Sequence, residues 1–199
     1  MVLNYNSAKE KLLTFDIDGC QRFFAENGHL LELGYCYLLS DRLDDARETF
    51  EVARNYDKRA NWGLFMANLF SDRPADYPSY FELRNFLEID LNILINAGKG
   101  EYVEKLVSYA DFFYTINPEV YKFIGRVFLN NDLKQYGYFF LMRAKDYFYQ
   151  DPELHYILSE YFFNNNDYSE AKKYAQSCLD ILPEYFPAKK MMRKINAAV

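Results

Sequence analysis

The sequence predicts an all-α protein, an α-solenoid of about 10–12 helices stacked as antiparallel hairpins. Two observations lead to this prediction. Between Leu30 and Ala53, apolar residues recur at helical spacing on both sides of a short polar turn. Turn and proline signals then recur every 31 to 35 residues, which is the period of stacked helical repeats. We therefore expect one repeat domain spanning residues 1–199.

The composition and the net charge of the chain limit which kinds of partner it is expected to bind. Half of the residues are hydrophobic, 26% are charged and the net charge is −6, which is typical of a folded chain and argues against a nucleic-acid partner. No stretch approaches the roughly 18 apolar residues of a membrane helix. No secretion signal opens the chain, so no membrane partner is expected and the cytoplasm is the expected compartment.

Cysteine usage predicts neither a disulfide framework nor a zinc site. Cys20, Cys36 and Cys178 are odd in number and widely spaced. Cys36 lies between two tyrosines on a predicted helix, where we expect it to be packed.

Aromatic content is high, with 19 Tyr and 18 Phe against one Trp. Each aromatic side chain buries a large area and makes directional ring contacts. Two interpretations stay open, packing between helices and the lining of an aromatic groove.

The N-terminal segment, residues 1–26, is predicted to form a helical cap. Ser7 is the expected N-cap of a short helix over residues 9–15. Residues 16–19 look like a break, and a second helical run follows over residues 21–26. This segment would cover the apolar end of the array.

Residues 27–57 contain the clearest hairpin. Two helices flank a polar turn at residues 40–42. Gly34 and Ala46 are small enough to let the two helix backbones approach closely, and Phe50 would fill the space beside them.

This hairpin resembles a tetratricopeptide repeat, a helix–turn–helix unit of 34 residues. The residues on the family's signature positions are Leu33, Gly34, Tyr37, Ala46, Phe50 and Ala53. Leu30 stands where the family often has Trp, and Lys58 where it usually has Pro. The resemblance implies a right-handed superhelix whose ligands bind on the concave face.

Later repeats match more loosely. Pro118, Pro152 and Pro183 each follow a predicted helix, and polar turns recur at residues 100–102, 131–133 and 166–168. The best of these units has helices over residues 152–164 and 167–182, and the unit before it would end in a long helix over residues 133–149. We expect about five repeats across residues 27–185.

Residues 71–97 are predicted to be irregular. A helix over residues 60–70 is followed by a Pro-rich loop at 71–78 and then by residues 79–97 without a helix breaker. The last stretch is either one straight helix or two helices bent near residues 86–88. We expect an irregular repeat from which the loop projects, and a simple insertion is the alternative.

Residues 186–199 are predicted to be a C-terminal capping helix. The four cations in this segment are Lys189, Lys190, Arg193 and Lys194, with no acid near them. We interpret them as complementing the dipole of the last helix rather than as a binding surface.

No catalytic or cofactor-binding constellation is present in the sequence. His29 and His155 are the only histidines and have no ligand set at metal-binding spacing. No serine lies in a Gly-x-Ser-x-Gly elbow, and Gly98 and Gly100 lack the rest of a phosphate-binding loop. The sequence therefore predicts a protein that is not an enzyme and has no cofactor or metal.

The resemblance implies a binding groove for a protein or peptide partner. Its candidate residues are Leu31, Tyr35, Leu38, Leu39, Lys122, Arg126, Tyr156, Glu160 and Phe163. Some members of the family grip a chaperone's C-terminal carboxylate, but Leu31 and Tyr35 occupy those positions here, so an apolar or aromatic segment is the expected ligand. Lys122 and Arg126 would pair with an acid on it. In the alternative interpretation these side chains pack between repeats, or the N-terminal cap fills the groove.

Two functions fit these observations. The first is an adaptor that binds a peptide or protein segment in the groove. The alternative is a small bacterial secretion-type chaperone or a self-assembling structural subunit such as a homodimer. The secretion-type chaperone is suggested by a faint similarity of Tyr56-Asp57-x-Arg59 to such chaperones.

Overall fold

The structure is a computed structural model that describes residues 3–147 and 150–198. Within them it contains thirteen helices and no strand, which confirms the all-α class with a slightly larger helix number than expected. The helices are α1 (Tyr5–Leu13), α2 (Ile17–Asn27), α3 (Leu30–Leu39), α4 (Leu43–Ala53), α5 (Arg59–Phe70), α6 (Tyr80–Asn96), α7 (Gly100–Ser108), α8 (Ala110–Ile116), α9 (Val120–Asn130), α10 (Lys134–Tyr147), α11 (Pro152–Asn164), α12 (Tyr168–Ile181) and α13 (Phe186–Ala198).

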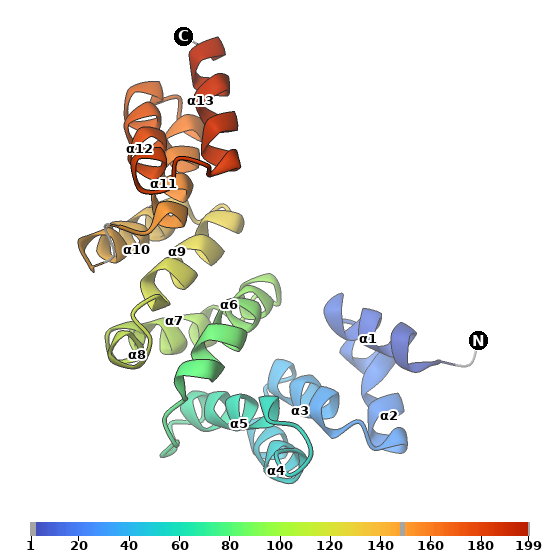
Figure 1. Cartoon of the computed structure of the whole chain (residues 1–199). Helices are drawn as coiled ribbons and strands as arrows, with labels where there is room; N and C mark the ends of the chain where they lie inside the picture. The colour runs from blue at the N-terminus through green and yellow to red at the C-terminus, as the bar shows by residue number, and fades with distance from the viewer. Residues whose placement is uncertain (1–2, 148–149, 199) are drawn as a thin grey trace. The chain divides into compact units, whose positions relative to one another are not determined.

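The helices pack mainly against their neighbours in sequence, as α3 with α4, α9 with α10 and α11 with α12 (Figure 1). They form two compact units, residues 1–112 and 113–199, which are described separately below. Antiparallel hairpins are thus confirmed as the building element. A single domain and a right-handed superhelix stay predictions.

Helices α3 and α4 form the hairpin that the sequence predicts. Phe50 is fully buried, and a Cβ atom added to Gly34 would lie 2.5 Å from its ring. Gly63 of α5 contacts the same ring, because a Cβ there would lie 2.6 Å from it. The close approach at Gly34 is confirmed, and Gly63 extends it to the next helix.

A residue with left-handed backbone follows several of the helices. Asp41 after α3, Asp132 after α9 and Asn166 after α11 have φ of 61°, 58° and 62°, and Gly98 after α6 has 69°. Asp, Asn and Gly tolerate this conformation better than other residues do. The recurring turns are confirmed, and the one near residue 100 lies two residues earlier than expected.

The stretch 79–97 contains a single helix, α6, with Ser79 and Ala97 as its caps, and this decides between the two alternatives. The loop before it does not project freely from the unit. Pro78 is buried, the rings of Tyr77 and Phe112 lie 4.4 Å apart, and Arg73 pairs with Asp44 of α4 at 2.7 Å. The expected projection is therefore wrong, because the burial of Pro78 and these two side-chain contacts hold the loop against the helices of unit 1.

Helix α6 begins with a capping box. Ser79 accepts a hydrogen bond from the backbone N–H of Glu82, and the Glu82 carboxylate accepts one from the backbone N–H of Ser79. We expect Ser79→Ala to lower the free energy of unfolding by about 1 kcal/mol, measured by urea denaturation. Ser169→Ala, at an exposed serine in the first turn of α12, is the matched control. Equal stability of the two variants would contradict the capping role.

The N-terminal segment forms two helices, α1 and α2. The expected N-cap at Ser7 is wrong, because Asn4 accepts the hydrogen bond from the Ser7 backbone N–H at 2.9 Å. Gly19 lies inside α2, which is capped by Asp16, so the predicted break is shorter than residues 16–19. Ala8, Cys20 and Phe24 of this segment pack with Leu33 and Cys36 of α3 in one cluster.

In unit 2, two glycines bring α9 and α10 together. A Cβ atom on Gly125 would lie 3.1 Å from the carbonyl oxygen of Gly137, and one on Gly137 would lie 3.0 Å from that of Gly125. Helix α11 begins and ends as predicted, whereas the predicted end of α10 at residue 149 lies outside the described residues. Met191 and Ile195 of α13 pack in one cluster with Ala171 and Ala175 of α12.

Candidate functional site

One stripe of α3 faces a pocket in unit 1. Leu31, Tyr35 and Leu39 follow one another at intervals of four residues, so they lie on the same side of the helix. All three line a cavity of about 160 Å³. Leu38, the fourth predicted groove residue on this helix, is 1% exposed and does not line the cavity, so its assignment is corrected to a core residue.

Four helices build this pocket, which we call the α1–α3 pocket. The residues that line it are Lys9, Leu12, Leu13 and Phe15 of the α1 segment, Leu31, Glu32, Tyr35 and Leu39 of α3, Arg59 of α5, and Ile89 and Ile93 of α6. Leu13 is 58% exposed and Ile89 is 47% exposed, which leaves apolar surface in contact with water. The N-terminal cap thus forms one wall of the pocket and leaves space inside it.

A buried polar triad lies behind the α1–α3 pocket. The Tyr35 hydroxyl donates to Asp90 Oδ2 at 2.9 Å and accepts a hydrogen bond from Arg59 Nε at 3.0 Å. Arg59 also donates to Asp90 Oδ1 at 2.7 Å. The guanidinium of Arg59 lies over the rings of Tyr35 and Phe86. Tyr35 is therefore a structural link as well as a lining residue.

Burial and the charge of Arg59 have opposite effects on the pKa of Asp90 in this triad. Burial raises the pKa of the Asp90 carboxyl, and the Arg59 charge and the hydrogen bond from Tyr35 act against it. Burial also raises the pKa of the Tyr35 phenol. Since the Arg59 charge is matched by Asp90, the pocket presents a largely neutral, apolar lining.

Sequence reasoning missed Asp90 and Arg59. Asp90 is buried on α6 together with Leu87, Leu91 and Leu94, which lie within four residues of it. It is therefore an acid on an apolar helix face. That position was a usable signal, because a buried carboxylate needs a partner. The partner itself is 31 residues away in sequence and could not be read from the helix.

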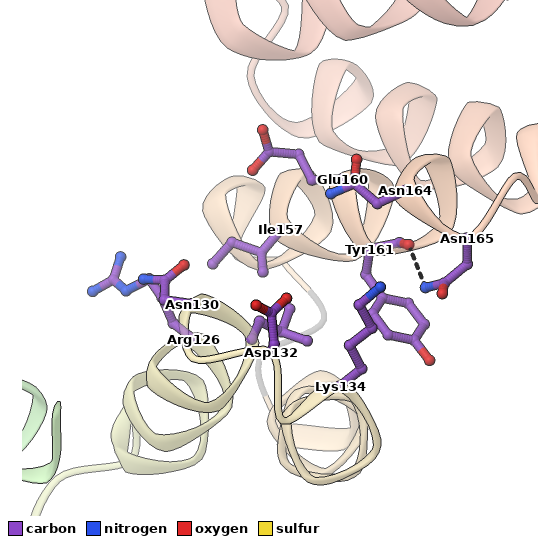
Figure 2. Close-up of a pocket in the computed structure, with 10 residues that line it drawn as sticks. Arg126, Asn130, Asp132, Lys134, Ile157, Glu160, Tyr161, Asn164 and Asn165 are labelled. Carbon is purple, nitrogen blue, oxygen red and sulfur yellow. Dashed lines mark hydrogen bonds between the residues drawn. The ribbon is translucent and has the colours of Figure 1, made fainter. Parts of the chain in front are cut away.

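Unit 2 contains a second, more polar pocket (Figure 2). Its volume is about 310 Å³, and its lining comes from α9, the start of α10, α11 and the turns that follow α9 and α11. The lining residues are Arg126, Leu129, Asn130, Asp132, Lys134, Ile157, Glu160, Tyr161, Asn164 and Asn165. Two of the predicted groove residues, Arg126 and Glu160, are among them.

Lys122 belongs to the charge network of the fold. It is 5% exposed, and its ammonium pairs with Asp151 at 2.6 Å, Glu119 at 3.0 Å and Glu153 at 3.0 Å. Burial alone would lower the pKa of Lys122, but the hydrogen bonds to Asp151 and Glu153 outweigh it, so the pKa is raised. The expected pairing of Lys122 with a ligand is corrected to a pairing within unit 2.

The remaining predicted groove residues divide between packing and surface. Phe163 packs against Tyr168, with ring centroids 5.5 Å apart, in the cluster that seats α13. The Tyr156 hydroxyl donates to Glu160, and its ring lies 5.6 Å from that of Tyr185. Tyr156 also lines a separate cavity beside α13.

The described residues contain no group of three or more His, Cys, Asp or Glu side chains that could hold a metal ion. The three cysteines are free and buried, as expected for Cys36. Across residues 3–147 and 150–198, none of the helices has the length and apolar character needed to cross a membrane.

Comparisons with protein-family models and with curated proteins found no match. Among solved structures, the chain is similar to the crystal structure of the APC/C hetero-tetramer Cut9-Hcn1, with a TM-score of 0.43 and 10% sequence identity. The similarity covers 95% of this chain and 48% of that chain, so the chain spans about half the length of the matched structure. Membership of the tetratricopeptide family stays a prediction.

Proposed function

We propose that this protein is a non-catalytic interaction module that binds an apolar segment of a protein partner in the α1–α3 pocket. The observation that carries the proposal is the convergence of Leu31, Tyr35 and Leu39 on one open cavity. These three residues belong to an apolar lining that continues onto the α1 segment and α6.

The size of the pocket supports a polypeptide ligand. Its volume of about 160 Å³ is below the roughly 300–1,000 Å³ of cavities that enclose drug-sized molecules. A cavity of this size suits one anchoring side chain of a segment that lies across the rim. Lys9 and Glu32 at the edge would contact the backbone or polar side chains of that segment.

The proposal is tested with the variant Leu31→Ser/Ile93→Ser, whose two positions are half-buried in the pocket wall. We expect the variant to bind the partner at least about tenfold more weakly, because two apolar contacts are lost. Affinity capture from native extract would identify the partner, and fluorescence anisotropy with its binding segment would measure the dissociation constant.

Val52→Ser/Phe81→Ser is the matched control, since both side chains are more than half exposed in the same unit and do not line the pocket. It should bind the partner like the wild type. Retained partner binding by a folded pocket variant would overturn the assignment.

A self-assembling subunit is the second candidate, and one observation favours it. Leu133, which directly precedes α10, and Tyr136 and Phe139 within it follow at intervals of three residues and are 37%, 62% and 53% exposed. An exposed apolar stripe of this kind is typical of interfaces between subunits. Light scattering separates the candidates, because self-assembly requires a mass above that of the 23.7 kDa chain.

A further inference from the structure

Helix α13 is the most basic element of an acidic protein. Its cations are Lys189, Lys190, Arg193 and Lys194, and no acid lies within Phe186–Ala198. The whole chain has a net charge of −6. The charge of α13 is thus opposite in sign to that of the rest of the molecule.

The dipole of α13 does not account for this charge. The last turn of the helix contains no basic residue. The favourable interaction of a cation with the helix dipole falls off within the last turn. The interpretation of the four cations as dipole partners is therefore wrong, and their placement in the body of the helix needs another reason.

Three of the four cations have no ion-pair partner among the residues that the structure describes. Lys189 pairs with Glu184 at 2.8 Å. Lys190, Arg193 and Lys194 are exposed and form no ion pair with any described residue. Their charges face solvent and are free to meet charges on another molecule.

Two of these cations border a cavity, which we call the α13 pocket. Its volume is about 270 Å³, and it is lined by Tyr156, Phe186, Pro187, Lys190, Met191 and Lys194. Lys190 and Lys194 are one helical turn apart, so both ammonium groups emerge on the same side. Phe186 is 68% exposed, whereas Met191 is 4% exposed and forms the base.

We propose that the α13 pocket binds an acidic segment of a partner protein. An apolar side chain of the segment would lie between Tyr156, Phe186 and Met191, while flanking carboxylates pair with Lys190 and Lys194. The combination of an apolar base with paired cations matches such a segment in both shape and charge. This site is separate from the α1–α3 pocket and can be tested independently of it.

A nucleic acid or an anionic membrane fits less well. Tight binding to a nucleic acid commonly uses about 6–10 phosphate contacts, and α13 offers three unpaired cations on a protein of net charge −6. The apolar base of the pocket also has no use in phosphate binding. A polypeptide that places one apolar side chain among acids uses every part of the site.

The test uses a fluorescein-labelled peptide in which four glutamates flank one phenylalanine, together with its all-glutamine counterpart. We expect the full-length protein to bind the glutamate peptide at least about tenfold more tightly than the glutamine peptide. Raising the salt from about 50 to about 300 mM should weaken binding severalfold. Lys190→Gln/Lys194→Gln should reduce the affinity for the glutamate peptide by about tenfold or more.

Lys172→Gln/Lys173→Gln removes the same charge from exposed positions on α12 and is the matched control. It should keep the affinity within about twofold of the wild type. Circular dichroism and the thermal transition establish that each variant is folded.

Equal affinity for the two peptides, or an equal loss in both lysine variants, would overturn the proposal. So would the absence of binding at about millimolar protein. Tighter binding to a 12-nucleotide uridine RNA or to phosphatidylserine vesicles than to the glutamate peptide would overturn the choice of a polypeptide.

Discussion

Gly34→Ala is expected to lower the free energy of unfolding by about 2–3 kcal/mol, because it overpacks the close contact between α3 and the Phe50 ring. The added Cβ atom would lie 2.5 Å from the Phe50 ring, well inside van der Waals contact. The ring cannot move away, since Gly63 contacts it so closely that a Cβ there would lie 2.6 Å from it. Tyr35 lies edge-on to the same ring, with centroids 5.4 Å apart, and Phe50 is fully buried.

Urea denaturation followed by Trp62 fluorescence measures this effect, because Trp62 is the one tryptophan and is fully buried in the same unit. Gly100→Ala is the control, since a Cβ atom there meets nothing within 4 Å and Gly100 opens α7. It should leave stability unchanged or raise it by about 0.5 kcal/mol.

The double variant Gly34→Ala/Phe50→Leu tests the cause. The smaller leucine side chain leaves room for the new methyl group, so the two losses should not add. Additive losses, or a Gly34→Ala variant within about 0.5 kcal/mol of the wild type, would contradict the packing argument.

Local signals made the best hairpin predictable. Gly34, Ala46 and Phe50 lie on two helices joined by three residues, so spacing alone places them in contact. The bounds of α11 were equally readable, because Asp151 caps the helix and Pro152 occupies its first turn. Where the residues that determine a helix or a hairpin lie within one or two helical turns of each other, the sequence was sufficient to predict it.

Contacts between distant segments were not predictable. The sequence predicts a loop that projects before α6, but Arg73 of this loop forms an ion pair with Asp44, which is 29 positions earlier in the chain. Its repeat position predicts that Lys122 is a cation in the binding groove. In the structure it pairs instead with Asp151 and Glu153 of the next hairpin. Repeat position predicts which face a side chain is on, and the neighbouring repeat decides whether it is free to bind a ligand.

The α1–α3 pocket was likewise predictable only in its local part, and its contacts between distant segments were not. Leu31, Tyr35 and Leu39 follow from helical spacing on α3 alone. The contributions of Leu13 and Ile89 depend on how α1 and α6 pack beside α3, which the sequence pattern does not state. The repeat pattern therefore located one wall of the site and left its depth and its polar base undetermined.

Asp90→Ala is expected to lower the free energy of unfolding by about 3 kcal/mol, the lower end of the range for breaking a buried ion pair. It leaves the Arg59 guanidinium and the Tyr35 hydroxyl without their shared acceptor. The loss falls at the lower end because the Arg59 side chain is 26% exposed and water can reach it.

A double-mutant cycle measures the interaction between Arg59 and Asp90 separately from the cost of burying their charges. Arg59→Met/Asp90→Leu removes both charges and fills the site with apolar groups, which is often close to neutral for a buried pair. We expect its loss to fall at least about 1 kcal/mol short of the sum for Arg59→Met and Asp90→Leu. Additive losses in the cycle would show that Arg59 and Asp90 do not depend on each other.

The pH dependence of Asp90→Asn provides the last measurement of this triad. Burial raises the pKa of Asp90 above its ordinary value of 3.8, so the folded chain holds this proton at higher pH than the unfolded chain. Stability from the protonated carboxyl is therefore complete below the unfolded pKa and is lost as pH rises through the folded pKa. The wild type should lose stability relative to Asp90→Asn as pH rises from about 4 to 7, measured by urea denaturation. A gain of wild-type stability over this interval would mean that the Arg59 charge, and not burial, controls the carboxyl, and the triad would then act as a net stabilising ion pair behind the pocket.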